Sequence, residues 1–116
     1  MSTKETVYIG LGSNLQDPCS QLRSALTAIA RTPCCTLTRV SSFYHSDSLL
    51  PGQPRYLNAV AAVETYLKPR ELLEALHQIE DRQDRVRAEH WGPRTLDLDI
   101  LLYGNRIINL PDLQIP

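Results

Sequence analysis

Two aspartates near the end of the chain have the residue type and spacing that most directly suggest chemistry. Asp97 and Asp99 lie in an otherwise apolar run from Leu96 to Tyr103. Side chains alternate between the faces of a strand, so a strand here places both carboxylates on one face, roughly 7 Å apart at Cα. Like charges this close repel unless a cation lies between them. The pair therefore predicts a divalent metal site, and open coordination positions suit Mg²⁺ with phosphate oxygens.

Three arginines precede the aspartates at positions suited to a polyphosphate. Arg85 and Arg87 lie in a predicted loop over residues 84–93, and Arg94 follows it. Guanidinium groups bind phosphate oxygens in a bidentate manner, so arginines beside metal-binding carboxylates would hold a metal and a polyphosphate together. The alternative is a solvated acidic face with exposed ion pairs, each worth about 0–1 kcal/mol. The residues alone leave both interpretations open.

Tyr56 and Asn58 form a second candidate site, because strand alternation places them on one face. An amide beside an aromatic ring can bind the edge of a flat heterocycle, although a buried Asn that pairs with backbone groups would give the same pattern. The Gly10 to Asn14 segment lacks the third glycine of a Rossmann motif and the Gly-Lys-Ser/Thr of a P-loop. The histidines have no metal-ligand spacing, and no serine or cysteine has a base partner, which disfavours covalent catalysis.

The elements that position these residues are predicted from apolar periodicity and turn residues. We expect helices over residues 18–31, with Asp17 as the N-cap, and 69–82, and strands over residues 7–11, 36–44, 56–66 and 96–103. Gly104-Asn105 predicts a hairpin turn before residues 106–108. The order strand, helix, strand, strand, helix, strand is typical of a ferredoxin-like α+β domain, an antiparallel sheet with helices packed on one face.

The composition predicts one globular domain over residues 1–116. The chain is 42% hydrophobic and 22% charged, and its 12 Lys+Arg nearly balance 13 Asp+Glu. This balance argues against binding nucleic acid by phosphate neutralisation, and one Trp and one Phe are too few to suggest an RNA-stacking surface. No apolar run suits a signal peptide or a membrane span. The three cysteines are interpreted as small apolar residues in a reducing compartment, so we expect a cytoplasmic protein.

These motifs together resemble the 6-hydroxymethyl-7,8-dihydropterin pyrophosphokinase family of folate biosynthesis, over almost the whole chain. The resemblance rests on YIGLGSN at 8–14, SFY at 42–44, YLNA at 56–59, the arginine pair at 85–87 and WGPRTLDLD at 91–99. It implies a ferredoxin-like fold and an ATP-dependent diphosphokinase. Such an enzyme transfers the β,γ-pyrophosphoryl group of ATP to the hydroxymethyl oxygen of the pterin and releases AMP, with two Mg²⁺ ions.

The resemblance also implies roles for individual residues. Asp97 and Asp99 are the implied metal ligands, and with Arg85 and Arg94 they form the implied catalytic set. The implied ATP-binding residues are Glu80, Arg85, Arg87, Trp91, Arg94 and Ile100. The implied pterin-binding residues are Gly12, Ser46, Leu49, Tyr56 and Asn58.

The chain departs from the family pattern in three places. Asp84 stands where the family generally has Gly, and Ser46-Asp47-Ser48 replaces a Thr-Pro-Pro type of sequence, which predicts a less rigid loop. The chain also ends at Pro116, before the family's His-Pro pair, a further arginine and an aromatic that stacks on the pterin. We therefore expect a domain that is C-terminally incomplete relative to the family.

Two functions fit these expectations: the pyrophosphokinase itself, or a catalytically silent module that binds nucleotide or pterin without the terminal residues. The implied partners are ATP and the hydroxymethyl-dihydropterin, with no nucleic acid and no membrane. The resemblance implies a monomer for the full-length family. A chain that ends at Pro116 is expected to expose core surface, which favours self-association or domain exchange.

Overall fold

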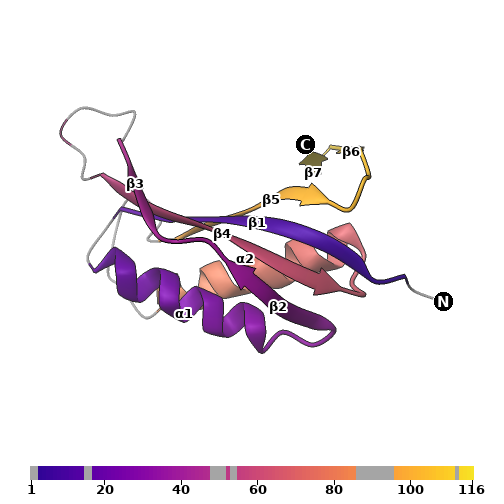
Figure 1. Cartoon of the computed structure of the whole chain (residues 1–116), viewed down its shortest axis with the longest axis horizontal. Coiled ribbons are helices and arrows are strands. Elements are labelled where there is room, and N and C mark those ends of the chain that lie inside the picture. Colours follow the sequence, from indigo (N-terminus) through magenta and orange to yellow (C-terminus); the bar gives the residue numbers. More distant parts are fainter. Residues whose placement is uncertain (1–2, 15–16, 48–51, 53–54, 86–95, 112) are drawn as a thin grey trace.

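The structure is a computed structural model that describes residues 3–14, 17–47, 52, 55–85, 96–111 and 113–116, with residues 84 and 85 described by their backbone alone. Its elements follow one another as shown in Figure 1. In chain order they are β1 (Glu5–Ser13), α1 (Pro18–Ala30), β2 (Cys35–Val40), β3 (Tyr44–Ser46), β4 (Tyr56–Thr65), α2 (Pro69–Arg85), β5 (Asp97–Tyr103), β6 (Ile108–Leu110) and β7 (Leu113–Ile115).

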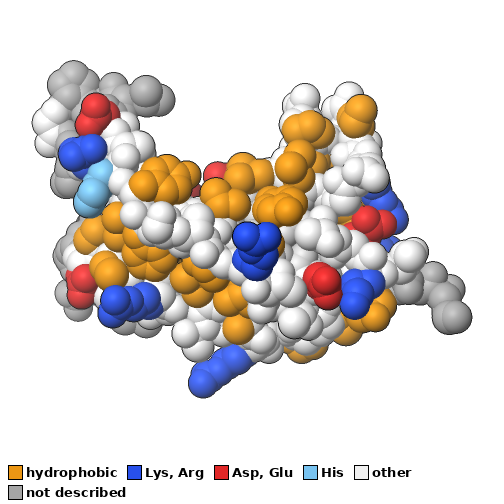
Figure 2. Space-filling model, in the orientation of Figure 1, with side chains coloured by type: hydrophobic (Ala, Val, Ile, Leu, Met, Phe, Trp, Pro, Cys, Tyr) orange, Lys and Arg blue, Asp and Glu red, His pale blue; other side chains and the backbone are white. Residues whose placement is uncertain are grey.

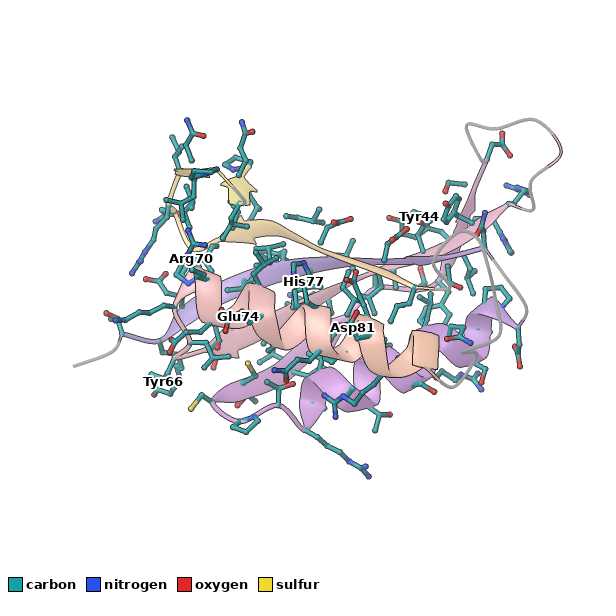
Figure 3. All side chains as sticks on the ribbon, turned by 180° about the vertical axis from the view of Figure 1, so that it is seen from behind. Tyr44, Tyr66, Arg70, Glu74, His77 and Asp81 are labelled. Carbon is teal, nitrogen blue, oxygen red and sulfur yellow. The ribbon has the colours of Figure 1, made fainter. Side chains whose placement is uncertain are left out.

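The main sheet is antiparallel, in the order β2-β4-β1-β5, and β3 also pairs with β4. Both helices cover the same face of this sheet, as the views from the two sides agree (Figures 1 and 3). A separate two-stranded sheet, β6 with β7, lies next to β5 on the side of the main sheet that faces away from the helices (Figure 1). The predicted α+β class, with an antiparallel sheet and two helices, is confirmed.

The core lies between the helices and one face of the sheet. Alternate residues of β1 and β4 point toward the helices and are buried, so the residues between them face the opposite side. The helices supply apolar side chains at three- and four-residue spacing, namely Leu22, Ala25 and Ile29 from α1 and Leu72, Leu76 and Ile79 from α2. Burying a Leu or Ile side chain contributes about 1.5–3 kcal/mol, so this face dominates stability and leaves the other face available for polar side chains.

Side-chain acceptors bind backbone N–H groups at the start of both helices. Asp17 Oδ1 accepts a hydrogen bond from Ser20 N at 3.4 Å before α1, and Glu71 Oε1 accepts one from Lys68 N at 2.7 Å before α2. The predicted helix starts are therefore confirmed. Neither described helix has the length and apolar character needed to cross a bilayer.

The end of α2 differs from the prediction. The helix continues past Arg82 to Arg85, through residues that the sequence placed in a loop. Arg is a good helix former and a cation at a helix C-terminus is favourable, so the chain has a physical reason to continue the helix there. Arg85 therefore belongs to the last turn of a helix, which fixes its backbone relative to the core.

The predicted strand over residues 36–44 is two strands, β2 and β3. Ser41 lies between them; its N–H donates to Val60 O at 2.8 Å, and its hydroxyl accepts from Val60 N at 2.9 Å. The hydroxyl takes the place of a backbone carbonyl, so β4 stays hydrogen-bonded while its partner changes from β2 to β3. Side-chain alternation does not signal such an exchange, which explains the error.

The turn at Gly104-Asn105 is confirmed, but the strand after it pairs differently from a simple hairpin. Gly104 has a φ of 55°, and Arg106 N donates to Tyr103 O at 3.0 Å. The chain then forms β6, which pairs with β7, and β7 returns Leu113 and Ile115 to the core. Three-residue strands are too short to give an alternating pattern, so the sequence does not predict this second pair.

The cysteines depart in part from their predicted role as small buried residues. Burial raises the pKa of the Cys35 thiol above its usual value, and its Sγ lies 3.2 Å from Thr65 Oγ1. Cys34, by contrast, is exposed in the turn before β2 and has a φ of 67°. A left-handed backbone is unfavourable for a residue with a Cβ, so Cys34 is held there by the connection between α1 and β2.

Replacing Cys34 with glycine is expected to raise the free energy of unfolding by about 1 kcal/mol, because glycine adopts a positive φ without a Cβ clash. Urea denaturation of the wild type and Cys34→Gly measures this difference. Cys34→Ala is the matched control, since it removes the thiol and keeps the Cβ. An equal gain in both variants would show that the thiol, and not the backbone conformation, sets the effect.

Candidate functional site

The face of the sheet that lacks helices is hollowed between β3 and the β6-β7 pair (Figures 1 and 2). Two glycines of β1 lie at the bottom of this hollow, and neither has a side chain that would fill it. A Cβ added to Gly12 would lie 3.3 Å from Asn58 Oδ1, and one added to Gly10 would lie 3.3 Å from Leu101 Cδ1. Both contacts are tight, so any side chain at Gly12 would enter the space beside the Asn58 amide.

Strand register aligns the candidate residues across this floor. Tyr44 pairs with Asn58, Asn58 with Gly12, and Gly12 with Asp97. Directly paired residues of antiparallel strands share a face, so these four form one row across β3, β4, β1 and β5. Asn58 and Asp97 are two strand spacings apart, about 10 Å, with bare backbone between them. A flat ring can lie over Gly12 with its edges near an amide and a carboxylate.

A cavity of about 430 Å³ occupies the part of the hollow nearest β3 and β4. The predicted pterin-side residues that the structure describes all line it: Gly12, Ser46, Tyr56 and Asn58. Asn58 Nδ2 donates to Ser46 Oγ at 2.7 Å and to Tyr44 O at 3.3 Å, so both amide hydrogens are directed toward β3. The amide is thereby held in one orientation, with Oδ1 on the side of Gly12.

A second cavity, of about 490 Å³, lies between α2, β5 and the β6-β7 pair. Glu80 and Ile100, for which the family resemblance implies ATP binding, line this cavity. Asp97 and Asp99 line both cavities. The acidic pair therefore lies where the two cavities meet, which is the position that a metal shared by two ligands requires.

His77, which Figure 3 labels, also lines the second cavity, although the spacing of the histidines predicts no site for it. It precedes Glu80 by three residues on α2, and residues at that spacing are neighbours on a helix surface. This spacing was the available signal, but it required knowing which face of α2 borders β5. His77 is exposed, so it lies at the rim, whereas Glu80 is buried.

Glu80 is a buried carboxylate, 4% exposed, that binds the backbone between the two aspartates. Its Oε2 accepts a hydrogen bond from Leu98 N at 2.8 Å. β5 is at the end of the described sheet, so an N–H that points away from β1 has no strand partner there. Glu80 supplies the acceptor and fixes the backbone that carries Asp97 and Asp99. The separation of the two carboxylates thus depends on a helix residue as well as on the strand.

The acidic pair itself is partly open to solvent. Asp97 is half-buried and Asp99 is exposed. Within the described ranges, no three His, Cys, Asp or Glu side chains form a group that could hold a metal ion by themselves. A cation at this pair would therefore take oxygens from a ligand or from water, which is the usual way in which Mg²⁺ is bound together with phosphates.

Several predicted site residues lie outside the described residues: Leu49, Arg87, Trp91 and Arg94. The structure describes the backbone of Arg85 and not its side chain. The phosphate-clamping role of the arginines therefore stays a prediction. Three of these residues belong to the segment that joins the end of α2 at Arg85 to the start of β5 at Asp97, which lines the second cavity.

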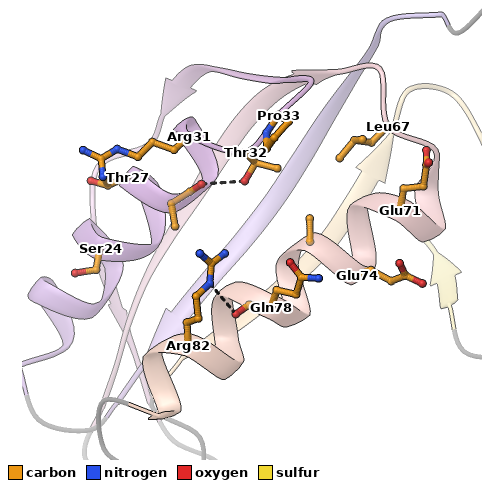
Figure 4. A pocket seen from close by; sticks show the side chains of 12 residues that line it. Ser24, Thr27, Arg31, Thr32, Pro33, Leu67, Glu71, Glu74, Gln78 and Arg82 are labelled. Carbon is orange, nitrogen blue, oxygen red and sulfur yellow. Dashed lines mark hydrogen bonds between the residues drawn. The ribbon is translucent and has the colours of Figure 1, made fainter.

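A larger cavity, of about 610 Å³, lies between α1 and α2 (Figure 4). None of the predicted site residues that the structure describes lines it. Its polar side chains include Thr32, whose Oγ1 donates to Ala28 O at 2.9 Å, and Arg82, whose Nε donates to Gln78 O at 3.4 Å. Both hydrogen bonds go to backbone carbonyls, one of α1 and one of α2. The arrangement that suggests chemistry is therefore on the other face of the sheet.

The fold and the site define a class of protein: a small α+β domain in which two ligand-sized cavities meet at a pair of carboxylates. A sequence model of the 7,8-dihydro-6-hydroxymethylpterin-pyrophosphokinase family matches residues 8–116, and the chain belongs to this family. The resemblance predicted from the motifs is confirmed.

Proteins named 2-amino-4-hydroxy-6-hydroxymethyldihydropteridine pyrophosphokinase are similar over nearly the whole chain. That of Pseudomonas putida is 55% identical over 109 residues, which cover 94% of this chain and 91% of the relative. That of Pseudomonas aeruginosa is 52% identical over 113 residues, covering 97% and 70%, respectively. That of Haemophilus influenzae is 55% identical over 112 residues, covering 96% and 70%.

Glu80→Ala is expected to lower the free energy of unfolding by about 1–3 kcal/mol, because it leaves the buried Leu98 N–H without its carboxylate acceptor. Glu80→Gln is the matched control: it keeps a side-chain oxygen of similar reach and is expected to lose less. Urea denaturation measures both. If the alanine variant were no less stable than the glutamine variant, the hydrogen bond would not be what holds β5 to α2.

Proposed function

We propose that this chain transfers pyrophosphate from ATP to 6-hydroxymethyl-7,8-dihydropterin, giving the pterin diphosphate and AMP, as a step of folate biosynthesis. Family membership and the names of the relatives support this activity. The main structural support for this activity is that Asp97 and Asp99 line both cavities. Two substrates bound on either side of β5 would present their reacting groups to the same two carboxylates.

The cavity beside β3 and β4 is the proposed pterin site. Gly12 gives the ring access to bare backbone, and Tyr56 offers an aromatic face. Asn58 presents Oδ1 as an acceptor for ring N–H groups, and Ser46 fixes its orientation through the 2.7 Å hydrogen bond. A ring bound to Asn58 and lying over Gly12 directs its far substituent along the row toward Asp97, where the hydroxymethyl group would react.

The cavity between α2 and β5 is the proposed nucleotide site. Its described lining combines apolar side chains, Leu73, Ile100 and Leu113, with the polar groups of His77 and Gln114 at the opening. Apolar side chains can pack against a flat base, and the polar groups of such a site, which here include Asp97 and Asp99, fix the orientation of the ligand. We assign Arg85, Arg87, Trp91 and Arg94 to the same site on their positions in the family motif, since their segment joins α2 to β5.

Asp97 and Asp99 are the proposed ligands of Mg²⁺, with two ions as the resemblance implies. The donor set fits: two carboxylates on one face, with coordination positions left for phosphate oxygens. When bound, Mg²⁺ supplies charge neutralisation at the transferred group and at the leaving phosphate. The chain's own contribution is to hold the two carboxylates at fixed separation, through β1 on one side of β5 and Glu80 on the other.

The reaction needs positioning more than covalent participation by the protein. The hydroxymethyl oxygen of the pterin forms a bond to the β-phosphorus of ATP. The bond from that phosphorus to the oxygen bridging it to the α-phosphate breaks, and AMP leaves with that oxygen and its electron pair. The hydroxyl proton passes to water. The row from Asn58 to Asp97 orients the attacking group, and the arginines are assigned to stabilise the charge on the phosphates.

We also infer that the fold is ferredoxin-like. Strands β1, β2, β4 and β5 with helices α1 and α2 follow the order strand, helix, strand, strand, helix, strand, and the sheet order β2-β4-β1-β5 places β1 and β4 side by side in the middle. This order supports the inference, with β3 as an additional short strand paired to β4.

Asp97→Asn and Asp99→Asn are each expected to lower the rate of AMP formation at least about 100-fold, because each removes half of the acidic pair. AMP released from ATP in the presence of the hydroxymethyl-dihydropterin is measured by chromatography. Glu74→Gln is the control, an exposed carboxylate of α2 on the helical side of the molecule, and is expected to have wild-type activity. Undiminished AMP formation by both aspartate variants would overturn the proposed active site.

Calorimetry separates the enzyme from a silent binding module. Wild-type protein titrated with a non-hydrolysable ATP analogue and Mg²⁺, and assayed in parallel for AMP, is expected to show binding and turnover. Binding without any AMP above the protein-free background would instead support the module.

Removing divalent metal with EDTA is expected to abolish AMP formation and leave the far-ultraviolet circular dichroism unchanged, because the core is built from apolar side chains. Added Mg²⁺ should restore activity. Continued AMP formation in excess EDTA would show that the two carboxylates have a role other than metal binding.

A further inference from the structure

We propose that Tyr44 is a specificity-determining residue of the pterin-side cavity, a second aromatic wall against which the substrate ring packs. This proposal rests on the proposed function and deepens it, because the roles implied by the sequence motifs include no contact for Tyr44. The class of ligand is a flat, bicyclic nitrogen heterocycle.

The register of β3 places Tyr44 at the site. Tyr44 begins β3 and is directly opposite Asn58, so its side chain shares the face of the sheet on which Asn58 and Gly12 lie. It lines the same cavity of about 430 Å³ as Tyr56 and Asn58. Figure 3 labels Tyr44 on the side of the sheet away from α2, at the end where β3 rises.

Tyr44 also contacts Asn58, the residue proposed to bind the edge of the ring. Its backbone oxygen accepts a hydrogen bond from Asn58 Nδ2 at 3.3 Å. The hydroxyl of Ser46, two residues further along β3, accepts a second hydrogen bond from the same nitrogen at 2.7 Å. The amide of Asn58 is thus oriented by the short strand that carries Tyr44. A ring that binds to Asn58 is therefore held in a fixed position relative to the strand that carries Tyr44.

The exposure of Tyr44 distinguishes it from a structural aromatic. The residue is 49% exposed and lies outside the buried cluster of the core. Covering a half-exposed aromatic ring with a flat partner removes apolar surface from water, which favours binding. Aromatic rings also prefer offset or edge-to-face contact with one another. Packing of this kind requires a planar ligand, so Tyr44 should favour a flat ring over a puckered, fully reduced one.

The test compares Tyr44→Ala and Tyr44→Phe with the wild type in steady-state kinetics. Tyr44→Ala is expected to raise KM for the hydroxymethyl-dihydropterin about fivefold, with kcat and KM for ATP within about twofold, because the loss is one aromatic contact with the ring. Tyr44→Phe keeps the ring and should retain the wild-type KM. Tyr66→Ala is the matched control: Tyr66 is also 49% exposed but follows the other end of β4 and does not line the cavity.

Direct binding makes the proposal independent of turnover. 6-Hydroxymethylpterin, which is planar and fluorescent, and its puckered tetrahydro form are titrated against the wild type and Tyr44→Ala. The proposal requires a loss of affinity of about fivefold for the planar ring and a smaller loss for the puckered one. An equal loss for both, or a fall in kcat with rises in both KM values, would indicate a structural role and overturn it.

The role of Tyr44 and the proposed enzymatic function can be contradicted separately. If Tyr44→Ala binds the planar pterin like the wild type while Asp97→Asn abolishes AMP formation, the role of Tyr44 is wrong and the proposed function stands. If the wild type releases no AMP yet binds the planar pterin more tightly than Tyr44→Ala does, the role of Tyr44 stands and the proposed function fails.

Discussion

The site depends on the antiparallel register of β1 with its two neighbours. Pairing of Gly12 with Asn58 on one side and with Asp97 on the other places an amide and a carboxylate on one face, about 10 Å apart, with glycine between them. A shift of one residue in either pairing would turn one of these side chains into the core. The register is protected because the same shift would expose Val7, Ile9 and Leu11 of β1, which are buried.

Stability and chemistry are thereby divided between the two faces of one sheet. The helix-covered face contains the apolar side chains that stabilise the fold. The open face contains the polar and small residues that line the cavity beside β3 and β4, together with Asp97 and Asp99, which also line the second cavity. Glycines at positions 10 and 12 are tolerated in a central strand because their strand neighbours on the opposite face are fully packed. One face of the sheet is in this way left open for ligands while the other face stabilises the fold.

The last strand of the described sheet needs a further constraint, because β1 holds it on one side alone. Glu80 supplies it from α2 by accepting the Leu98 N–H, and its 4% exposure shows that a carboxylate is buried for this contact. Burying a charged carboxylate is costly unless hydrogen bonds compensate. The position of Glu80, beside both the aspartates and the second cavity, connects the geometry of the acidic pair to α2, the helix that borders this cavity.

The sequence by itself determined the local features. Alternation in the run from Leu96 to Tyr103 predicted a strand with Asp97 and Asp99 on one face, helix starts followed from proline and acceptor positions, and motif spacing led to the family, because each of these depends on residues close together in the chain. Only the tertiary structure decided which residues meet. The exchange of strand partners at Ser41, the pairing of β6 with β7, the contact of Glu80 with β5 and the place of Tyr44 and His77 at the cavities all depend on packing between distant segments, which periodicity within a segment does not encode.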